Sequence, residues 1–222
     1  MININFALKA ILAFTLAVFF VVFSYFFLDQ PIALWADSCH FFKHPLLKLM
    51  TKIAEGISLL FLCFFFMIFS QDLVKPNTYR HISLCIIGLF LPVTVLFKDC
   101  LKIFFGRYWP VTWIENNPSF IGSQEYGFHW FHRGLAYESF PSGHATITFY
   151  VMSVLWILIP KMRPLAVIFC FMQGVSLIAM NYHFLGDVLS GAFLGSICAI
   201  FAVKIASFPP LHVFLTRKKT KI

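Results

Sequence analysis

Long apolar runs are the feature of this sequence that most restricts its fold. They lie at about Phe6 to Leu28, Ile57 to Phe69, Ile82 to Phe97, Ala145 to Ile159, Leu165 to Met180 and Val188 to Ala206. Inside a bilayer the backbone has to satisfy its own hydrogen bonds, so such runs form helices. Several are short for a full crossing unless flanking residues join the helix. The sequence therefore predicts an all-α fold, a polytopic membrane bundle of about six transmembrane helices, with residues 1–222 forming a single membrane-embedded domain.

Composition supports a membrane protein and excludes other classes. Hydrophobic residues make up 60% of the chain and charged residues only 12%, which does not suit a soluble globule. The net charge of +8 is better explained by membrane orientation than by nucleic acid, so no nucleic-acid partner is expected. The six cysteines form no C-x-x-C pair, so neither a disulfide framework nor a zinc site is expected. The apolar run after Met1 lacks a small-residue cleavage site and is interpreted as a retained span.

The distribution of basic residues predicts an orientation, because cytoplasmic segments carry an excess of Lys and Arg. An even number of spans puts both termini on one side. With the termini in the cytoplasm, that side holds most of the basic residues, namely Lys9, Lys75, Arg80, Lys161, Arg163, Lys204, Arg217, Lys218, Lys219 and Lys221. We expect a multi-pass protein of the inner (plasma) membrane with a basic cytoplasmic tail at 207–222. The long aromatic loop at 105–140 then lies outside, where it is either a cover for a substrate or an interfacial aromatic belt.

Three polar segments interrupt this apolar pattern. The stretch E-S-F-P-S-G-H-A-T has the form of a helix start, where Ser142 and Gly143 offer unpaired backbone N–H groups to an anion beside His144. His183 and Asp187 lie four residues apart at the start of the last apolar run. The third segment is basic, with Lys98 and Lys102 on one helix face and Arg107 just beyond Gly106. Cations at this depth either meet an anion or extend toward lipid headgroups.

We expect the fold to bring these three segments together on one rim of the membrane bundle, and together they suggest a reaction. A histidine oriented by a carboxylate is a nucleophile, and a second histidine can protonate a leaving oxygen. Nearby cations stabilise the charge on a transferring phosphoryl group. The combination predicts hydrolysis of a phosphate ester through a phosphohistidine, with no metal and no other cofactor. A single histidine on a membrane helix is more often a packing residue, but two with such neighbours favour catalysis.

The same residues give the chain a resemblance to a known family. It resembles the type 2 phosphatidic acid phosphatase superfamily, whose motifs are K-x6-R-P, P-S-G-H and S-R-x5-H-x3-D. The second motif is complete, the first begins at Lys102, and the third matches at Ser176, His183 and Asp187. The resemblance implies His183 as nucleophile, Asp187 as its partner and His144 as general acid. It also implies that Lys102, Ser142 and the Gly143 backbone hold the phosphate of a lipid phosphate or lipid pyrophosphate.

Two positions depart from the family pattern. Trp109 and Leu177 stand where the first and third motifs have arginine, so two guanidinium groups expected on the phosphate are missing. Arg107 is the predicted substitute, with Lys98 or Arg133 assisting. A lipid phosphotransferase of the same fold and a non-catalytic protein that binds lipid phosphate are the alternatives. Phosphatidate, phosphatidylglycerol phosphate, undecaprenyl pyrophosphate and lipid A phosphates all fit the motifs, and protein partners and oligomeric state are not predicted.

Overall fold

The computed structural model describes residues 4–52, 79–112 and 116–207, with several single positions between 56 and 67. Helices dominate these residues, and β-pairing within them is limited to three isolated bridges. The helices are α1 (Ile4–Phe23), the π-helix η1 (Ser24–Leu28), α2 (Asp29–Ser38), η2 (Phe41–Lys43), α4 (Tyr79–Phe105), α5 (Phe120–Ser123), η3 (Leu135–Tyr137), α6 (Gly143–Leu158), η4 (Pro160–Met162), α7 (Arg163–Ala179) and α8 (Leu185–Ala206).

The predicted fold class, a helical membrane bundle, is confirmed. Four helical segments in the described part of the chain are long and apolar enough to cross a membrane, Leu8–Ser38, Ser83–Phe105, Pro160–Ala179 and Leu185–Ala206. The apolar helix α6 is shorter. The predicted span at 57–69 falls largely outside the described residues, as does the basic tail from residue 208 onward.

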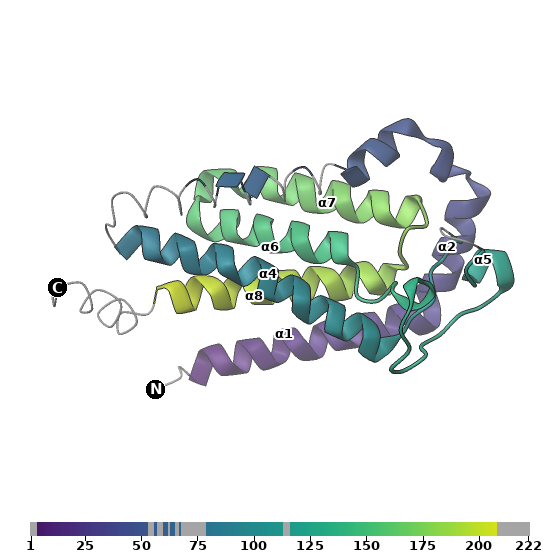
Figure 1. The fold of residues 1–222 in the computed structure, drawn as a ribbon, viewed down its shortest axis with the longest axis horizontal. Helices are drawn as coiled ribbons and strands as arrows, with labels where there is room; N and C mark the ends of the chain where they lie inside the picture. The colour runs from purple at the N-terminus through teal and green to yellow at the C-terminus, as the bar shows by residue number, and fades with distance from the viewer. Residues whose placement is uncertain are drawn as a thin grey trace.

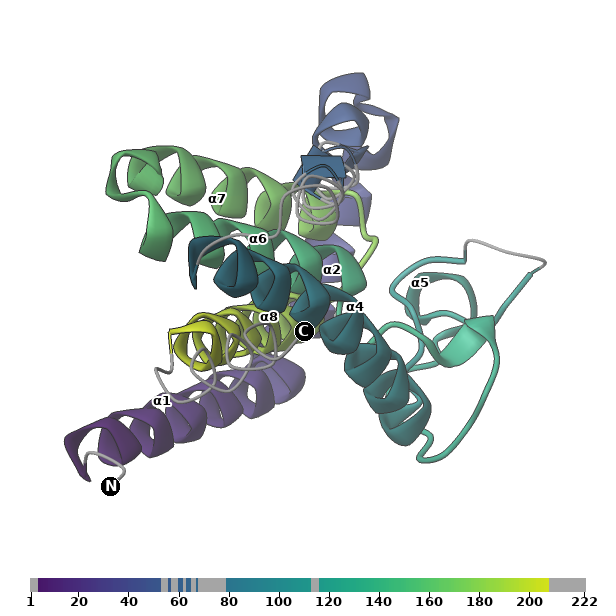
Figure 2. The same cartoon turned by 60° about the vertical axis from the view of Figure 1, so that its left-hand side comes forward.

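Helix α6 lies at the centre of the bundle and packs on α8, α7 and α4. Tyr150 and Val151 of α6 are almost fully buried in the main apolar core, which α4, α7 and α8 also line. Two glycines of α8 allow α6 to come close. A Cβ at Gly191 would overlap the Ser142 carbonyl oxygen, and one at Gly195 would overlap the Thr146 carbonyl oxygen. Helix α1 packs along α8 at the edge of the bundle, as both views show (Figures 1 and 2).

The direction of each helix brings the three polar segments to one end of the bundle. Helices α4 and α7 end there, whereas α6 and α8 begin there (Figure 1). The loop that carries α5 lies at this same end. The start of α1 and the end of α8 lie at the opposite end. The predicted juxtaposition of the loop and the two histidine segments is therefore present in the fold.

The loop after α4 folds back on the bundle through a glycine turn. Gly106 has a φ of +56°, and a Cβ there would overlap the carbonyl oxygen of His129. The backbone N–H of His129 donates to Gly106 O at 2.6 Å. The rings of Phe105, Phe128 and Phe140 then pack together, with centroids 4.8 to 5.8 Å apart. This turn fixes the direction in which the next residue, Arg107, enters the protein.

Candidate active site

The start of α8 presents the predicted nucleophile beside its carboxylate. Asp187 lies in the first turn of α8, where its Oδ2 accepts a hydrogen bond from the Phe184 backbone N–H at 3.0 Å. The same oxygen accepts from Ser139 Oγ at 2.6 Å and lies 3.5 Å from His183 Nδ1. Because Nδ1 faces this carboxylate, the second ring nitrogen, Nε2, is left for a substrate.

Burial controls the charge of His183. The side chain is only 3% exposed, and loss of solvent lowers the pKa of His183 to about 4. The Asp187 carboxylate acts in the opposite direction, whereas the positive charges of Lys102 and His144 lower the pKa further. The imidazole is therefore neutral near pH 7, which is the form that can act as a nucleophile.

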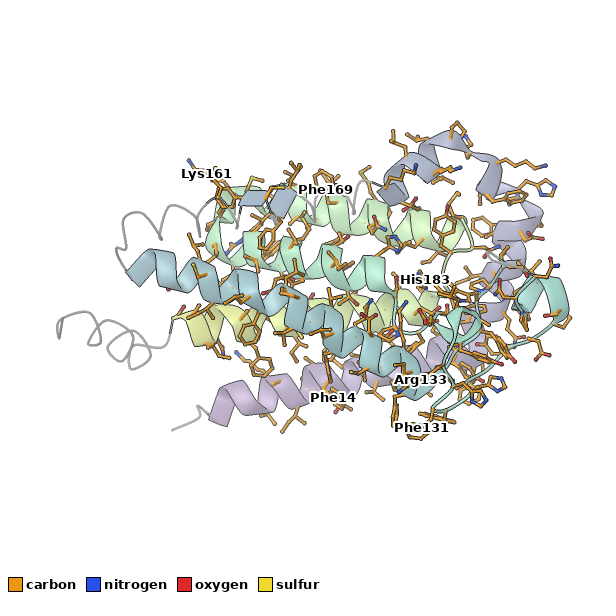
Figure 3. The ribbon with its side chains drawn as sticks, viewed as in Figure 1. Phe14, Phe131, Arg133, Lys161, Phe169 and His183 are labelled. Atoms are coloured by element: carbon orange, nitrogen blue, oxygen red, sulfur yellow. The ribbon has the colours of Figure 1, made fainter. Side chains whose placement is uncertain are left out.

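The start of α6 places the second histidine across from the first. The Ser142 backbone N–H donates to the Asp187 carbonyl oxygen at 3.0 Å, which joins the start of α6 to the first turn of α8. Ser142 also caps α6, because its Oγ accepts from the Ala145 N–H at 3.3 Å. The ring centroids of His144 and His183 are 6.4 Å apart. Figure 3 shows His183 at this end of the bundle.

Two lysines of α4 lie at the same place. The Nζ of Lys98 would be 3.4 Å from a Cβ at Gly143, so its ammonium group lies beside the start of α6. That ammonium pairs with Asp99 at 2.5 Å. The Nζ of Lys102 lies 5.6 Å from the Trp109 ring centroid. The structure thus brings Lys98, Lys102 and Gly143 to the two histidines, as the sequence predicted.

Arg107 does not take the position that the sequence suggested. Its side chain is 1% exposed, with Nη1 donating to Asp187 Oδ1 at 2.5 Å and Nη2 to Asp29 Oδ2 at 2.6 Å. Burial on its own would lower the pKa of Arg107, but the charges of Asp187 and Asp29 outweigh it and raise the pKa. A guanidinium held by two buried carboxylates, one of them the partner of His183, is not free to bind a phosphate. Arg107 is therefore a partner of Asp187 and not a substitute for the missing arginines.

Trp109, which replaces the arginine of the first motif, packs against the predicted nucleophile. Its ring centroid lies 5.0 Å from that of His183, and its Nε1 donates to the Leu135 carbonyl oxygen at 2.6 Å. Leu177, at the other missing arginine, is fully buried in an apolar cluster. Arg133 is exposed on the loop and lies apart from His183 (Figure 3). No arginine among the described residues replaces either missing guanidinium at the histidine pair.

The sequence did not predict a role for three residues near His183 and Asp187. In the sequence, Ser139 is only part of the polar stretch before Pro141, and Trp109 is only a departure from the first motif. Asp29 is the first residue after the first predicted span and belongs to no motif. Their contacts with Asp187, His183 and Arg107 cross long separations in the chain, so no local spacing signals them.

The described part of the chain holds no group of three or more His, Cys, Asp or Glu side chains arranged to bind a metal ion. The histidine pair is instead surrounded by lysines, a carboxylate and a helix start. This set of groups is suited to binding and transferring a phosphoryl group.

A comparison with family models identifies the family of this chain. The model of the PAP2 superfamily matches residues 82–209, which run from α4 to the end of α8 and contain both histidines, Asp187 and the two lysines. The chain belongs to the PAP2 superfamily. Searches of curated proteins and of solved structures gave no significant match. Membership supports a phosphatase-type activity for this PAP2 protein, and Asp29 lies outside the matched region.

Proposed function

We propose that this PAP2 protein is an integral-membrane phosphatase that hydrolyses a lipid phosphate or lipid pyrophosphate through a phosphohistidine on His183. The observation that carries the proposal is the pairing of a neutral, carboxylate-held imidazole with a second imidazole 6.4 Å away. A nucleophile lies about 3–3.5 Å from phosphorus and a general acid about 2.6–3.2 Å from the oxygen that it protonates. Two rings at this centroid separation are close enough to face one phosphoryl group.

The proposed reaction has two steps. In the first, His183 Nε2 forms a bond to phosphorus, the bond from phosphorus to the leaving oxygen breaks, and His144 gives its proton to that oxygen. In the second, His144 removes a proton from water, whose oxygen attacks phosphorus and releases His183 and inorganic phosphate. Asp187 stabilises the positive charge that the His183 ring carries while it is phosphorylated.

The phosphoryl oxygens would bind at the start of α6. Gly143 has no side chain to block the backbone N–H groups of the first turn, and Lys98 lies directly beside it. Lys102 adds a second positive charge near His183. Ser142 remains a predicted phosphate contact, although its oxygen already caps the helix. These groups do not need a metal ion to neutralise the phosphate.

A lipid substrate is supported by an apolar cavity next to this position. The cavity has a volume of about 590 Å³ and lies between α1, α4 and α8. Its walls include Val18 and Val22 of α1, and it reaches Phe140 and Pro141, which directly precede Ser142. A hydrocarbon chain in this cavity would keep its phosphate at the start of α6. We place this end of the bundle on the outer face of the plasma membrane and both termini in the cytoplasm.

The test is phosphate release in detergent with EDTA, from phosphatidate and from a prenyl pyrophosphate. We expect metal-independent release that His183→Ala abolishes and that His132→Ala, which removes an exposed loop histidine, leaves unchanged. After incubation with ³²P-labelled substrate and an alkaline quench, the native protein should carry label and His183→Ala should not. Release by His183→Ala at the native rate would remove the mechanism.

His144 is tested separately through the leaving group. Because a general acid matters most when the leaving oxygen is basic, His144→Ala should lower kcat for an alkyl phosphate by about 10²–10⁴-fold. The loss for p-nitrophenyl phosphate, whose phenolate leaves readily, should be much smaller. Equal losses on both substrates would contradict the role of His144 as the acid. Transfer of the phosphoryl group to an added lipid alcohol instead of water would identify the phosphotransferase alternative.

A further inference from the structure

Asp29 is a buried carboxylate in the N-terminal helical segment, outside the region that the family model matches. It is 1% exposed and begins α2, directly after the π-helical turn η1. Its Oδ1 accepts hydrogen bonds from Ser24 Oγ at 2.6 Å and from the Gly186 backbone N–H at 2.9 Å. A buried carboxylate is unfavourable unless it is paired and hydrogen-bonded, and these partners, together with an arginine, meet that need.

Arg107 connects Asp29 to the active-site carboxylate. Its two terminal nitrogens each bind a different aspartate, Asp29 at 2.6 Å and Asp187 at 2.5 Å. The guanidinium is enclosed by aromatic rings whose centroids lie 4.5 to 5.3 Å from Cζ, those of Tyr25, Tyr126, Phe128 and Phe184. Because water is kept out, the charges of the three side chains act on each other with little screening.

A charged trio, made of Asp29, Arg107 and Asp187, contributes its net charge to the electrostatic potential at His183. Two carboxylates and one guanidinium leave one net negative charge, and the Oδ2 atom of Asp187, which does not bind Arg107, faces the imidazole. If Asp29 were neutral, Arg107 would cancel Asp187 and the trio would carry no net charge. The His183 ring, which becomes positive when it is phosphorylated, would then lose most of its electrostatic support.

We propose that Asp29 is a positioning residue of the active site, which acts through Arg107 to hold the Asp187 carboxylate and its negative charge against His183. The inference rests on the proposed function of His183. Asp29 touches no reacting atom. Its contact with Gly186, in the first turn of α8, also ties the N-terminal helical segment to the element that carries Asp187.

The main test compares Asp29→Asn with Asp29→Glu and a matched control. Tyr150→Phe is the control, because it removes a buried hydrogen bond between α6 and α4, from Tyr150 Oη to Ile87 O at 2.6 Å, without changing charge. The first measurement is an NMR pH titration of ring-labelled histidine in detergent, with the His183 signal identified by its loss in His183→Gln. The groups that face His183 are Asp187, Ser139, Lys102, His144 and Trp109, and none of them is changed.

We expect Asp29→Asn to move the His183 titration to lower pH, because its ring loses negative potential. With p-nitrophenyl phosphate, kcat should fall by about 10–100-fold, the size of loss that follows when a residue supporting a functional histidine is removed, with little change in KM. Asp29→Glu should restore most of both properties, and Tyr150→Phe should leave both unchanged. If Asp29→Asn keeps the native titration and kcat, or if Tyr150→Phe shows the same losses, the proposal is overturned.

Two further comparisons apply if Asp29→Asn does not fold or if the native protein is inactive. If Asp29→Asn does not fold, Ser24→Ala removes only the hydrogen bond to Asp29 Oδ1, and it should move the titration and kcat in the same direction by a smaller amount. A Ser24→Ala protein identical to the native one in both measurements would then overturn the proposal. If the native protein releases no phosphate, the proposed function fails, but the NMR titration still decides whether Asp29 controls His183.

Discussion

Asp187 is the residue on which the polar contacts of the site converge. Its Oδ1 binds Arg107, while its Oδ2 accepts from Ser139 and the Phe184 backbone N–H and faces His183. Each contact fixes the carboxylate from a different direction. A carboxylate held in this way keeps the neighbouring imidazole in one orientation, with Nδ1 toward Asp187 and Nε2 on the other side of the ring.

The low pKa of His183 predicts the acid side of the pH–rate profile. Because burial lowers the pKa from 6.5 to about 4, the ring is neutral and nucleophilic above about pH 4 and protonated below it. We expect kcat/KM for p-nitrophenyl phosphate, corrected for the ionisation of the substrate, to be retained down to this pH and then to fall about tenfold per pH unit. A break near 6.5 that is present in both the native protein and His144→Ala would contradict a buried nucleophile.

The sequence predicted the site residues that lie close together along the chain. It missed those whose partners lie far away along the chain. His183 and Asp187 are one helical turn apart, and His144 belongs to a four-residue motif, so each could be found without a structure. The hydrogen bond from Ser139 to Asp187 crosses 48 positions, and those from Arg107 cross 80 and 78. The sequence predicted that Arg107 binds the phosphate because it lies two residues before the expected arginine position. That spacing says nothing about the two carboxylates that bind Arg107 in the fold.

At the scale of elements, the N-terminal helical segment is longer than its apolar run. The sequence predicted a span that stops at Leu28, because Asp29 is charged and begins a less apolar stretch. The helical segment instead continues through η1 and α2 to Ser38. Asp29 is tolerated there because Arg107, Ser24 and the Gly186 N–H neutralise and bind its carboxylate. Only the folded chain supplies these partners, so the apolar pattern could not reveal this continuation.

Helix α1 forms one wall of the apolar cavity, and this predicts a chain-length effect. Val18→Trp would fill part of the cavity, so we expect a higher KM for a long-chain phosphatidate with little change for p-nitrophenyl phosphate. Leu16→Trp is the matched control, because Leu16 is on the same helix but does not line the cavity. The two side chains are similarly exposed, Leu16 at 47% and Val18 at 45%. The measurement is KM for both substrates in detergent micelles. Equal KM changes in the two variants would show that the cavity does not hold the lipid chain.

At the scale of the whole molecule, the order of the helices determines where chemistry can occur. Successive helices of the matched region run in opposite directions, so the end of α4 and the starts of α6 and α8 meet at one end (Figure 1). The sequence predicted this meeting from the positions of the polar segments relative to the apolar runs. It could not predict how closely α6 and α8 approach, which depends on Gly191 and Gly195 lying against the α6 backbone.

This arrangement makes the proposed orientation testable with two single-cysteine proteins. Cys39 is exposed just after α2, at the end of the bundle that carries His183, whereas Lys161 in η4 lies at the opposite end (Figures 1 and 3). The first protein keeps only Cys39, and the second carries Lys161→Cys with every native cysteine replaced by serine. Retained phosphate release shows that each is folded.

A maleimide that cannot cross membranes should label Cys39 in intact cells or spheroplasts, and should label Lys161→Cys only after the membrane is broken. The reason is that Lys161 and Arg163 belong to the basic surface that the charge bias assigns to the cytoplasm. The reverse pattern would place the histidine pair in the cytoplasm. The substrate would then have to be presented from the inner leaflet, because a phosphate headgroup does not cross the hydrocarbon to reach the start of α6 unaided.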